Sequence, residues 1–194
     1  MFVFNYFPPK TRHQVYNSHM DNDAKRKVAM LRRLRQVRRF GTGEVPREVI
    51  DDILEVARWT GSGMNRQPWE FVLVRNHDTL REIAEAEAAN SHLPGANFAI
   101  VIVMRGEMKE IETYDEARLT ERMLLAAAAH GIDAGIWWFK DGGAAAKRIL
   151  GIPEERRVRT AISFGYPAPE DSAQPPKKAD ARKPLSELLH EEKY

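Results

Sequence analysis

The sequence predicts an α+β fold in which a mixed or antiparallel sheet is flanked by helices. Segments with helical periodicity and hydrophobic segments of strand length both occur, but they do not alternate strictly along the chain. An all-parallel sheet needs that alternation, because most crossovers between parallel strands are helices. The 194 residues are enough for one domain with a substantial hydrophobic core.

The first part of the chain predicts an arm followed by two helices. Residues 1–22 show neither helical nor strand periodicity, and their aromatic and proline residues suit an extended N-terminal arm. This arm could pack on a partner subunit, be disordered or precede the true start. Residues 23–34 predict a basic helix with Asp23 as its N-cap. A second helix begins at Pro46, since proline is favoured at the first helical position, and leads to a Gly-Ser-Gly turn at 61–63.

The rest of the chain supplies the strands and helices of the core. Hydrophobic runs predict strands at 71–74, 98–104, 135–139 and 159–165, and helical spacing predicts helices at 78–89, 114–130 and 144–150. The run AIVIV within 98–104 is typical of a strand covered on both faces. The tail, residues 168–194, is polar and becomes helical only near 185–190. We therefore predict a single domain over residues 23–194.

The composition excludes several kinds of site. The chain has no cysteine, which excludes disulfides, zinc–thiolate centres and thiol nucleophiles and fits a reducing cytoplasm. The six histidines lack the spacing of a metal motif, and no Walker, Gly-x-Gly-x-x-Gly or Gly-x-Ser-x-Gly motif is present. No apolar run approaches the ~20 residues of a membrane span. We expect no bound metal and no membrane partner.

Charged residues cluster in two places. Eight lysines or arginines but only one acid lie between Asp23 and Phe40, although the net charge is only +2. This balance is too even for a dedicated nucleic-acid binder, which needs many phosphate contacts, and favours a local anion site. Nucleic-acid binding through residues 25–39 stays as an alternative. Four acids could suggest paired carboxylates, but they lie where a loop meets the start of a predicted helix, whose dipole they would stabilise: Glu110, Glu112, Asp115 and Glu116.

Two motifs in a fixed order carry the strongest functional signal. The first is LRQVRRF at 34–40, whose Arg35 and Arg38 would share a face on a helix or tight turn. Guanidinium groups bind phosphate in a bidentate manner. The second is TGSGMNRQPWEFVLV at 60–74, in which two glycines allow close approach to a flat ligand or a positive φ. Its proline favours an extended conformation at Gln67.

These motifs, in this order, resemble the FMN-dependent nitroreductase family, in which an arginine stretch, a helix and an Asn-x-Gln-Pro-Trp loop follow one another. The resemblance runs from about residue 28 to about residue 189. It implies a nitroreductase-like fold and an intertwined homodimer with FMN at the subunit interface. It also implies hydride transfer from NADH or NADPH through flavin N5 to a small acceptor such as a nitroaromatic or quinone. Dehydrogenase, dehalogenase and deazaflavin-linked reductase activities on the same fold remain alternatives.

The resemblance also assigns cofactor-binding residues, while the flavin itself carries the chemistry, so that no catalytic side chain is expected. Arg35 resembles a ligand of the FMN phosphate or ribityl chain, and Arg38 resembles the cation at the N1–C2 edge of the ring. Arg182 resembles a basic residue of the tail that returns to the phosphate. The covering loop would come from the partner subunit. The other residues assigned are Gln36, Gly61, Ser62, Gly63, Met64, Asn65 and Gln67.

A third segment, GIDAGIWWFK at 131–140, resembles the family segment whose backbone amide meets flavin N5. By spacing, that amide belongs to Trp138 or Phe139. Because neighbouring residues of a strand face opposite sides, only one of Trp137 and Trp138 is expected to contact the ligand. The sequence leaves open which one does.

Overall fold

The computed structural model describes residues 22–87, 92–168 and 182–194. The contacts divide the chain into two units, Met1–Arg33 and Leu34–Tyr194. In the first unit, α1 (Asn22–Arg33) confirms the predicted basic helix and buries no residue of its own. Asp23 lies within its first turn, so its predicted place as the N-cap is wrong. The predicted arm lies outside the described residues, apart from its last residue.

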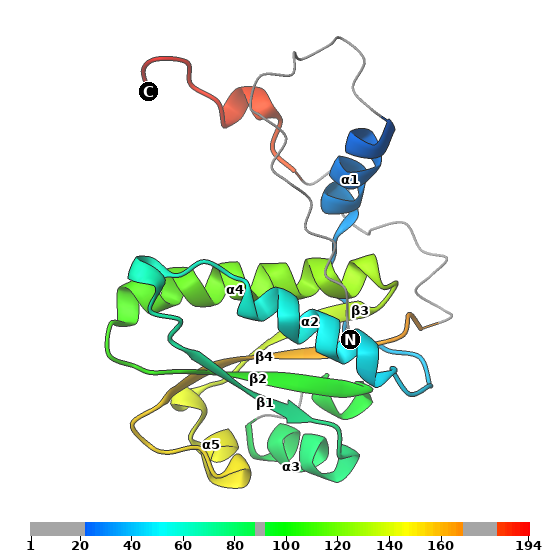
Figure 1. Ribbon diagram of the computed structural model, residues 1–194, viewed down its shortest axis with the longest axis vertical. Coiled ribbons are helices and arrows are strands. Elements are labelled where there is room, and N and C mark those ends of the chain that lie inside the picture. The colour runs from blue at the N-terminus through cyan, green and yellow to red at the C-terminus, as the bar shows by residue number, and fades with distance from the viewer. Residues whose placement is uncertain (1–21, 88–91, 169–181) are drawn as a thin grey trace, which may run out of the picture. The chain divides into compact units, whose positions relative to one another are not determined.

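The second unit is built on a four-stranded antiparallel sheet with the strand order β1-β2-β4-β3 (Figure 1). The strands are β1 (Trp69–Val74), β2 (Phe98–Met104), β3 (Asp133–Trp138) and β4 (Arg157–Gly165). Every residue of β2 is buried, as its uninterrupted hydrophobic run predicts. The α+β prediction is confirmed, and the sheet proves to be purely antiparallel with β1 and β3 at its edges.

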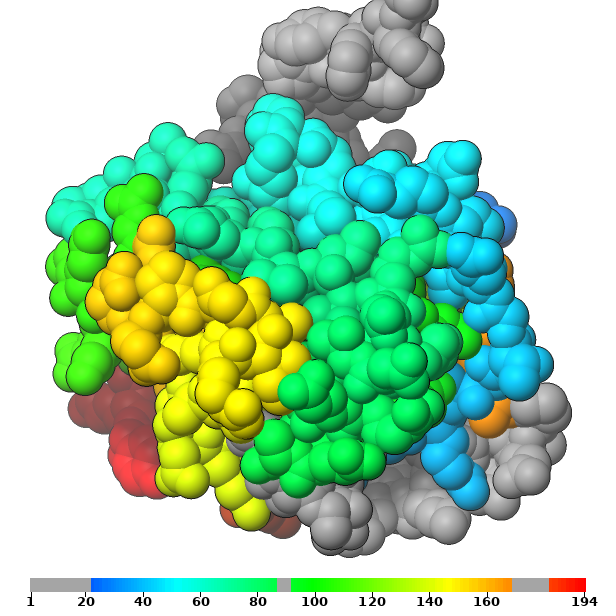
Figure 2. All heavy atoms as spheres, turned by 90° about the horizontal axis from the view of Figure 1, so that it is seen from below, coloured from blue at the N-terminus to red at the C-terminus, as the bar shows by residue number. Residues whose placement is uncertain are grey.

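Helices cover both faces of this sheet. On one face, α2 (Arg47–Arg58) and α4 (Lys109–Ala129) enclose a core with alternate residues of β2 (Figure 1). On the other face, α3 (His77–Glu87) and α5 (Ala144–Leu150) enclose a second core, and Figure 2 shows these two helices side by side. Among the described residues, no helix combines the length and hydropathy needed to cross a membrane.

Two helices begin at positions that differ from the prediction. The central helix α4 begins at Lys109, five residues before Tyr114. Its first turns are stabilised because the Glu112 carboxylate accepts three backbone N–H groups from the preceding turn. Helix α2 begins at Arg47, and Pro46 is its N-cap rather than its first helical residue. In the tail, a short helical turn spans Leu185–Glu187, within the predicted segment.

Candidate functional site

The arginine stretch lies along the outer edge of β3. Val37 N–H donates to Ala134 O at 2.8 Å, and Gln36 Oε1 accepts the Ile136 N–H at 3.3 Å. The backbone comes this close because residue 135 is glycine, since a Cβ there would overlap the Val37 carbonyl oxygen. The stretch is neither helix nor turn, so the expected shared helical face of its arginines is wrong.

His92 contacts the same edge of β3 through its imidazole ring. Its Nε2 lies 3.2 Å from Ile136 O, and its Nδ1 lies 2.8 Å from Ser163 Oγ. Because a carbonyl oxygen only accepts, Nε2 carries the hydrogen of this contact. The Ser163 hydroxyl also donates to Gly135 O at 3.0 Å. Burial lowers the pKa of His92 from its ordinary value of 6.5; the hydrogen bond to Ile136 opposes this shift and the charge of Arg38 adds to it.

This lowered pKa predicts a pH dependence of stability. The unfolded chain binds a proton at His92 more readily than the folded chain, so the free energy of unfolding should fall as the pH drops below about 6.5. His92→Gln keeps a donor for Ile136 O but cannot titrate, so its stability should fall less. Urea denaturation of both proteins between about pH 7.5 and about pH 5.5 measures the difference. If the free energy of unfolding changed equally with pH in the two proteins, the burial of a neutral imidazole would be contradicted.

A cavity of about 730 Å³ opens beside this edge (wall residues 38–42, 92, 94–95 and 167–168). Arg38 and Arg39 supply positive charge, while Phe40, Pro94 and Pro167 supply apolar surface. A cavity of this size with flat apolar walls and a few charged groups is typical of a small-molecule or cofactor site.

The C-terminal end of β3 leaves one backbone donor on the open edge. Phe139 N–H donates to Arg159 O at 2.9 Å, so its amide is already used and its side chain is buried. In an antiparallel pair the backbone groups alternate in direction, which turns the Trp138 N–H outward. The Trp138 ring is 57% exposed and lies 3.9 Å from the Arg159 guanidinium, whereas Trp137 points to the opposite face and packs edge-on against His92.

The loop at 61–67 lies at the other end of α4. The Gly63 N–H lies 3.1 Å and 3.3 Å from the two carboxylate oxygens of Asp115, and Gln67 N–H donates to Ser62 Oγ at 2.8 Å. Three non-glycine residues have φ between 47° and 53°: Met64, Asn65 and Gln67. The expected extended conformation before Pro68 is therefore wrong at Gln67. Such backbone is costly unless the surroundings support it.

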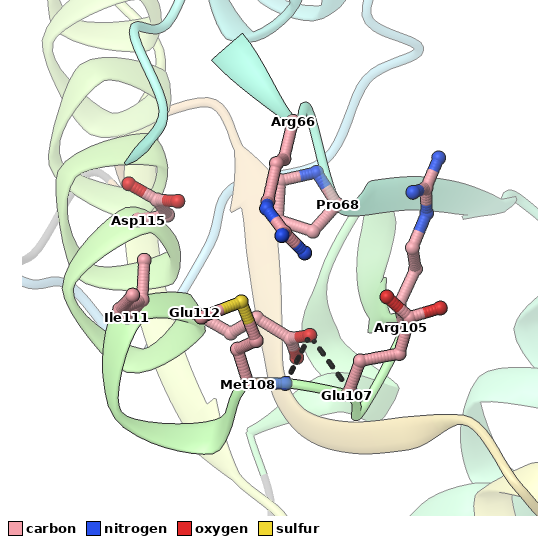
Figure 3. Close-up of a pocket in the computed structure, with 8 residues that line it drawn as sticks. All are labelled: Arg66, Pro68, Arg105, Glu107, Met108, Ile111, Glu112 and Asp115. Carbon is pink, nitrogen blue, oxygen red and sulfur yellow. Dashed lines mark hydrogen bonds between the residues drawn. The ribbon is translucent and has the colours of Figure 1, made fainter. Parts of the chain in front are cut away.

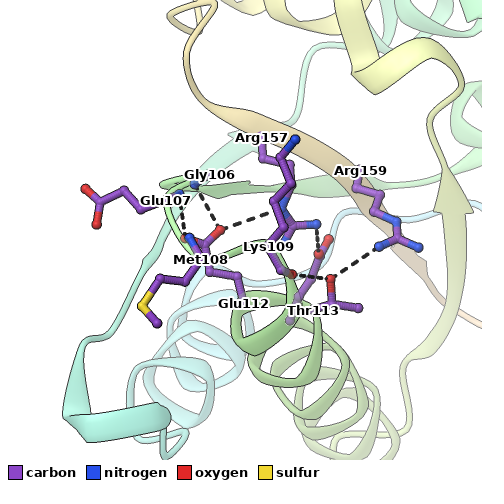
Figure 4. Close-up of polar contacts among 9 residues, drawn as sticks. Gly106, Glu107, Met108, Lys109, Glu112, Thr113, Arg157 and Arg159 are labelled. Carbon is purple, nitrogen blue, oxygen red and sulfur yellow. Dashed lines mark hydrogen bonds and ion pairs between the residues drawn. The ribbon is translucent and has the colours of Figure 1, made fainter.

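The structure adds four residues that the sequence did not assign to a site. Glu112, Asp115 and Glu116 are at most 4% exposed. Arg157 pairs with Glu112 (Figure 4) and also with Glu116. The predicted role of these acids, stabilising the helix dipole, is incomplete because Asp115 binds the loop and Glu116 binds Arg157. Their i, i+3 and i+4 spacing could have signalled one buried helix face. Within the described ranges, no group of His, Asp or Glu is arranged to hold a metal.

One chain keeps the arginine stretch and the loop at 61–67 apart. The loop is attached to Asp115 in the N-terminal half of α4, whereas the stretch bonds to Ala134 at the start of β3, which follows the C-terminal end of that helix (Figure 1). The other end of β3 returns toward the loop, since Trp138 contacts Arg159, whose Nη1 lies 3.5 Å from Thr113 Oγ1. From Asp115 to Ala129 the helix rises about 20 Å. Arg182 is exposed, and it follows residues 169–181, which are outside the described part of the chain.

The chain is thus a small α+β domain with a cationic cavity beside the edge of its sheet. A model described as "Nitroreductase family" matches residues 31–105 of this chain. A protein of Archaeoglobus fulgidus, provisionally named NADH dehydrogenase/NAD(P)H nitroreductase, is 32% identical over 150 residues, which cover 74% of this chain and 86% of the relative. The chain belongs to the nitroreductase family.

Solved structures agree with this assignment of the fold. An FMN-dependent nitroreductase from Clostridium difficile R20291 superposes with a TM-score of 0.75 at 21% identity, over 86% of this chain and 99% of its own. A nitroreductase from Desulfovibrio desulfuricans, provisionally so named and solved in complex with FMN, has a TM-score of 0.73 at 27% identity over 87% and 97% of the two chains. The predicted nitroreductase-like fold is confirmed.

Proposed function

We propose that this chain is an FMN-dependent oxidoreductase that passes a hydride from NAD(P)H to a small acceptor. Its family membership and its relatives support FMN and NAD(P)H as the cofactor pair. The observation that carries the proposal is the arginine stretch bound along the edge of β3, beside a cavity lined by cations. When bound, FMN supplies the hydride-accepting and hydride-donating chemistry.

The side chains and backbone groups at this edge fit FMN by their chemistry. Arg35 and Arg38 carry permanent positive charge, which suits a phosphate and an electron-rich ring edge. Arg35 would hold the phosphate or ribityl chain, and Arg38 would lie at the N1–C2 edge of the ring. The outward Trp138 N–H would donate a hydrogen bond to N5. Apolar walls from Phe40 and Pro167 suit a flat aromatic ring.

A second copy of the chain would complete this site. A flat ring in an open cavity needs cover to exclude water, and the loop at 61–67 is the predicted cover. Within one chain that loop is attached to the far end of α4, away from the arginine stretch. We propose that each loop covers the FMN of the partner subunit in a homodimer. Nitroaromatics and quinones are the proposed acceptors, because flat rings fit a pocket shaped for one.

The cofactor and its contact with Arg38 can be tested together. The purified protein should release FMN on heating, identified by chromatography. Arg38→Ala should lower the flavin midpoint potential, because a charge-assisted contact worth ~1.5–3 kcal/mol no longer favours the reduced form. Arg47→Ala removes an exposed guanidinium from α2 and should leave the potential unchanged.

Two results would contradict the proposal. Finding FAD, or no flavin after reconstitution with excess FMN, would remove the cofactor assignment. An unchanged potential in a fully loaded Arg38→Ala protein would leave the cofactor in place but move Arg38 away from the ring.

A further inference from the structure

A buried carboxylate attaches the loop at 61–67 to the N-terminal turns of α4. Asp115 is 3% exposed, and its two carboxylate oxygens face the Gly63 N–H at 3.1 Å and 3.3 Å. Arg118 lies 3.7 Å from the same carboxylate and also borders Gly61, where a Cβ would lie 3.0 Å from its Nη2. A backbone amide held by a buried anion is a strong, directional contact.

The loop is packed closely against this end of the helix. A Cβ at Gly63 would lie only 2.8 Å from Ile111 Cγ2, so the backbone approaches the helix as closely as a glycine allows. Figure 3 shows Arg66 and Pro68 facing Ile111 and Asp115 across a space of only about 10 Å³. That volume is water-sized, so the loop rests on the helix.

The helix end that receives the loop is itself fixed to the sheet. Glu112 accepts the N–H groups of residues 106–108 at 2.9–3.2 Å (Figure 4). Arg157 of β4 lies with Nη1 2.7 Å from Glu116 Oε2 and with Nε 3.6 Å from Glu112 Oε2. A continuous set of polar contacts therefore joins β4 to the start of α4, from which Asp115 reaches the loop.

The backbone of the loop needs such a support. Its three non-glycine residues with φ near +50° lie in a region that costs L-amino acids free energy. The contacts inside the loop are few: Gln67 N–H to Ser62 Oγ, Gln67 Nε2 to Asn65 O, and two turn hydrogen bonds at 3.0 Å and 3.1 Å. The Asp115 carboxylate adds a buried hydrogen bond from α4 to this conformation, beside the packing of Ile111 and Arg118.

We propose that Asp115 is a positioning residue whose carboxylate fixes the loop in the conformation that covers the FMN of a second copy of this chain. The identity of the covered ligand rests on the proposed function, whereas the control of the loop conformation does not. Asp115 touches neither ligand nor reacting atoms and acts through Gly63. Its removal should release the loop while the arginine stretch and the cavity stay intact.

The first readout needs no flavin. Trypsin cleavage after the exposed Arg66, followed by mass spectrometry of the flavin-free protein, reports how often the loop opens. Asp115→Ala should accelerate this cleavage by about tenfold or more, and Asp115→Asn should lie between Asp115→Ala and the wild type, because its oxygen still accepts but carries no charge. Glu121→Gln removes an exposed carboxylate from the same helix and should leave cleavage unchanged.

The second readout separates positioning from simple loss of stability. Leu80→Ala opens a cavity in the other core, on the opposite face of the sheet. It should lower stability without selective cleavage after Arg66 and with near-normal FMN affinity. Asp115→Ala should raise the FMN dissociation constant by about tenfold or more. Equal weakening by Leu80→Ala at an equal loss of stability would overturn the positioning role.

The remaining outcomes distinguish this inference from the proposed function. Unchanged cleavage after Arg66 in Asp115→Ala would overturn the inference whatever the flavin does. Faster cleavage with wild-type FMN affinity would show that the loop does not cover the flavin, so the positioning role would fail while the FMN function stood. A wild-type protein that binds no FMN would overturn both the function and the covering role, even if the loop opened.

Discussion

Arg157→Met should lower the free energy of unfolding by about 3–5 kcal/mol, the cost of leaving a buried charge without its partner. The Glu112 and Glu116 side chains are 4% and 5% exposed, and the guanidinium that faces them is 15% exposed. Without Arg157, two buried carboxylates on one face of α4 would lose the counter-charge that pairs with both of them. Urea denaturation of the two proteins at neutral pH measures the loss.

Two further variants test this explanation. Arg47→Met breaks the pair with Asp51, whose side chains are more than half exposed, and should cost less than about 1 kcal/mol. A triple variant that adds Glu112→Gln and Glu116→Gln to Arg157→Met should recover part of the loss, because the uncompensated charges are gone. An Arg157→Met protein no less stable than Arg47→Met would contradict the buried ion pair.

Gly135→Ala should abolish tight FMN binding. The added Cβ would overlap the Val37 carbonyl oxygen and crowd His92 Cε1 and Ser163 Oγ at 3.2–3.3 Å. Because β3 is held in the sheet by β4, the arginine stretch is the segment that must move away from the edge of β3. Overpacking typically costs ~1–3 kcal/mol, and displacement of the arginines should weaken FMN binding at least about tenfold in a fluorescence titration.

A second glycine substitution provides the control for stability. Nothing lies within 4 Å of a Cβ built at Gly95, so Gly95→Ala should leave the free energy of unfolding close to that of the wild type. If Gly135→Ala kept both the stability and the FMN affinity of the wild type, the arginine stretch would not be held along β3 as described.

The elements that depend on local patterns were predictable from the sequence. The uninterrupted hydrophobic run at 98–104 identified β2, the basic segment at 23–34 identified α1, and Pro46 marked the start of α2 to within one residue. The start of α4 was placed too late because its first turns depend on Glu112, whose capping partners lie before the helix. The spacing of hydrophobic residues carries no information about that contact.

The site was predictable in its motifs but not in its geometry. The pairing of Glu116 with Arg157 joins residues 41 positions apart, so no local spacing reveals it. The loop glycines were expected to allow close approach to a flat ligand or to take a positive φ. In the fold they lie against Arg118 and Ile111 of α4, while the positive φ values fall on Met64, Asn65 and Gln67, so their approach to a ligand stays a prediction. Contacts between the loop and α4, which are distant in sequence, determine which loop residues take a positive φ.

The shared cofactor site is tested most directly by mixed dimers with two different lesions. One subunit carries Gly135→Ala, which disturbs the arginine stretch. The other carries Asn65→Val, which places a β-branched residue at φ 53° and distorts the loop. Two affinity tags allow the mixed dimer to be purified away from both parent proteins.

If each FMN lies between the β3 edge of one chain and the loop of the other, the mixed dimer has one site with both lesions and one with neither. Fluorescence titration should then find one tight FMN site in each mixed dimer, with the affinity of the wild type, while both parent proteins bind weakly. If the loop serves its own chain, every site carries one lesion, and a mixed dimer that binds FMN no better than its parents would contradict the shared site.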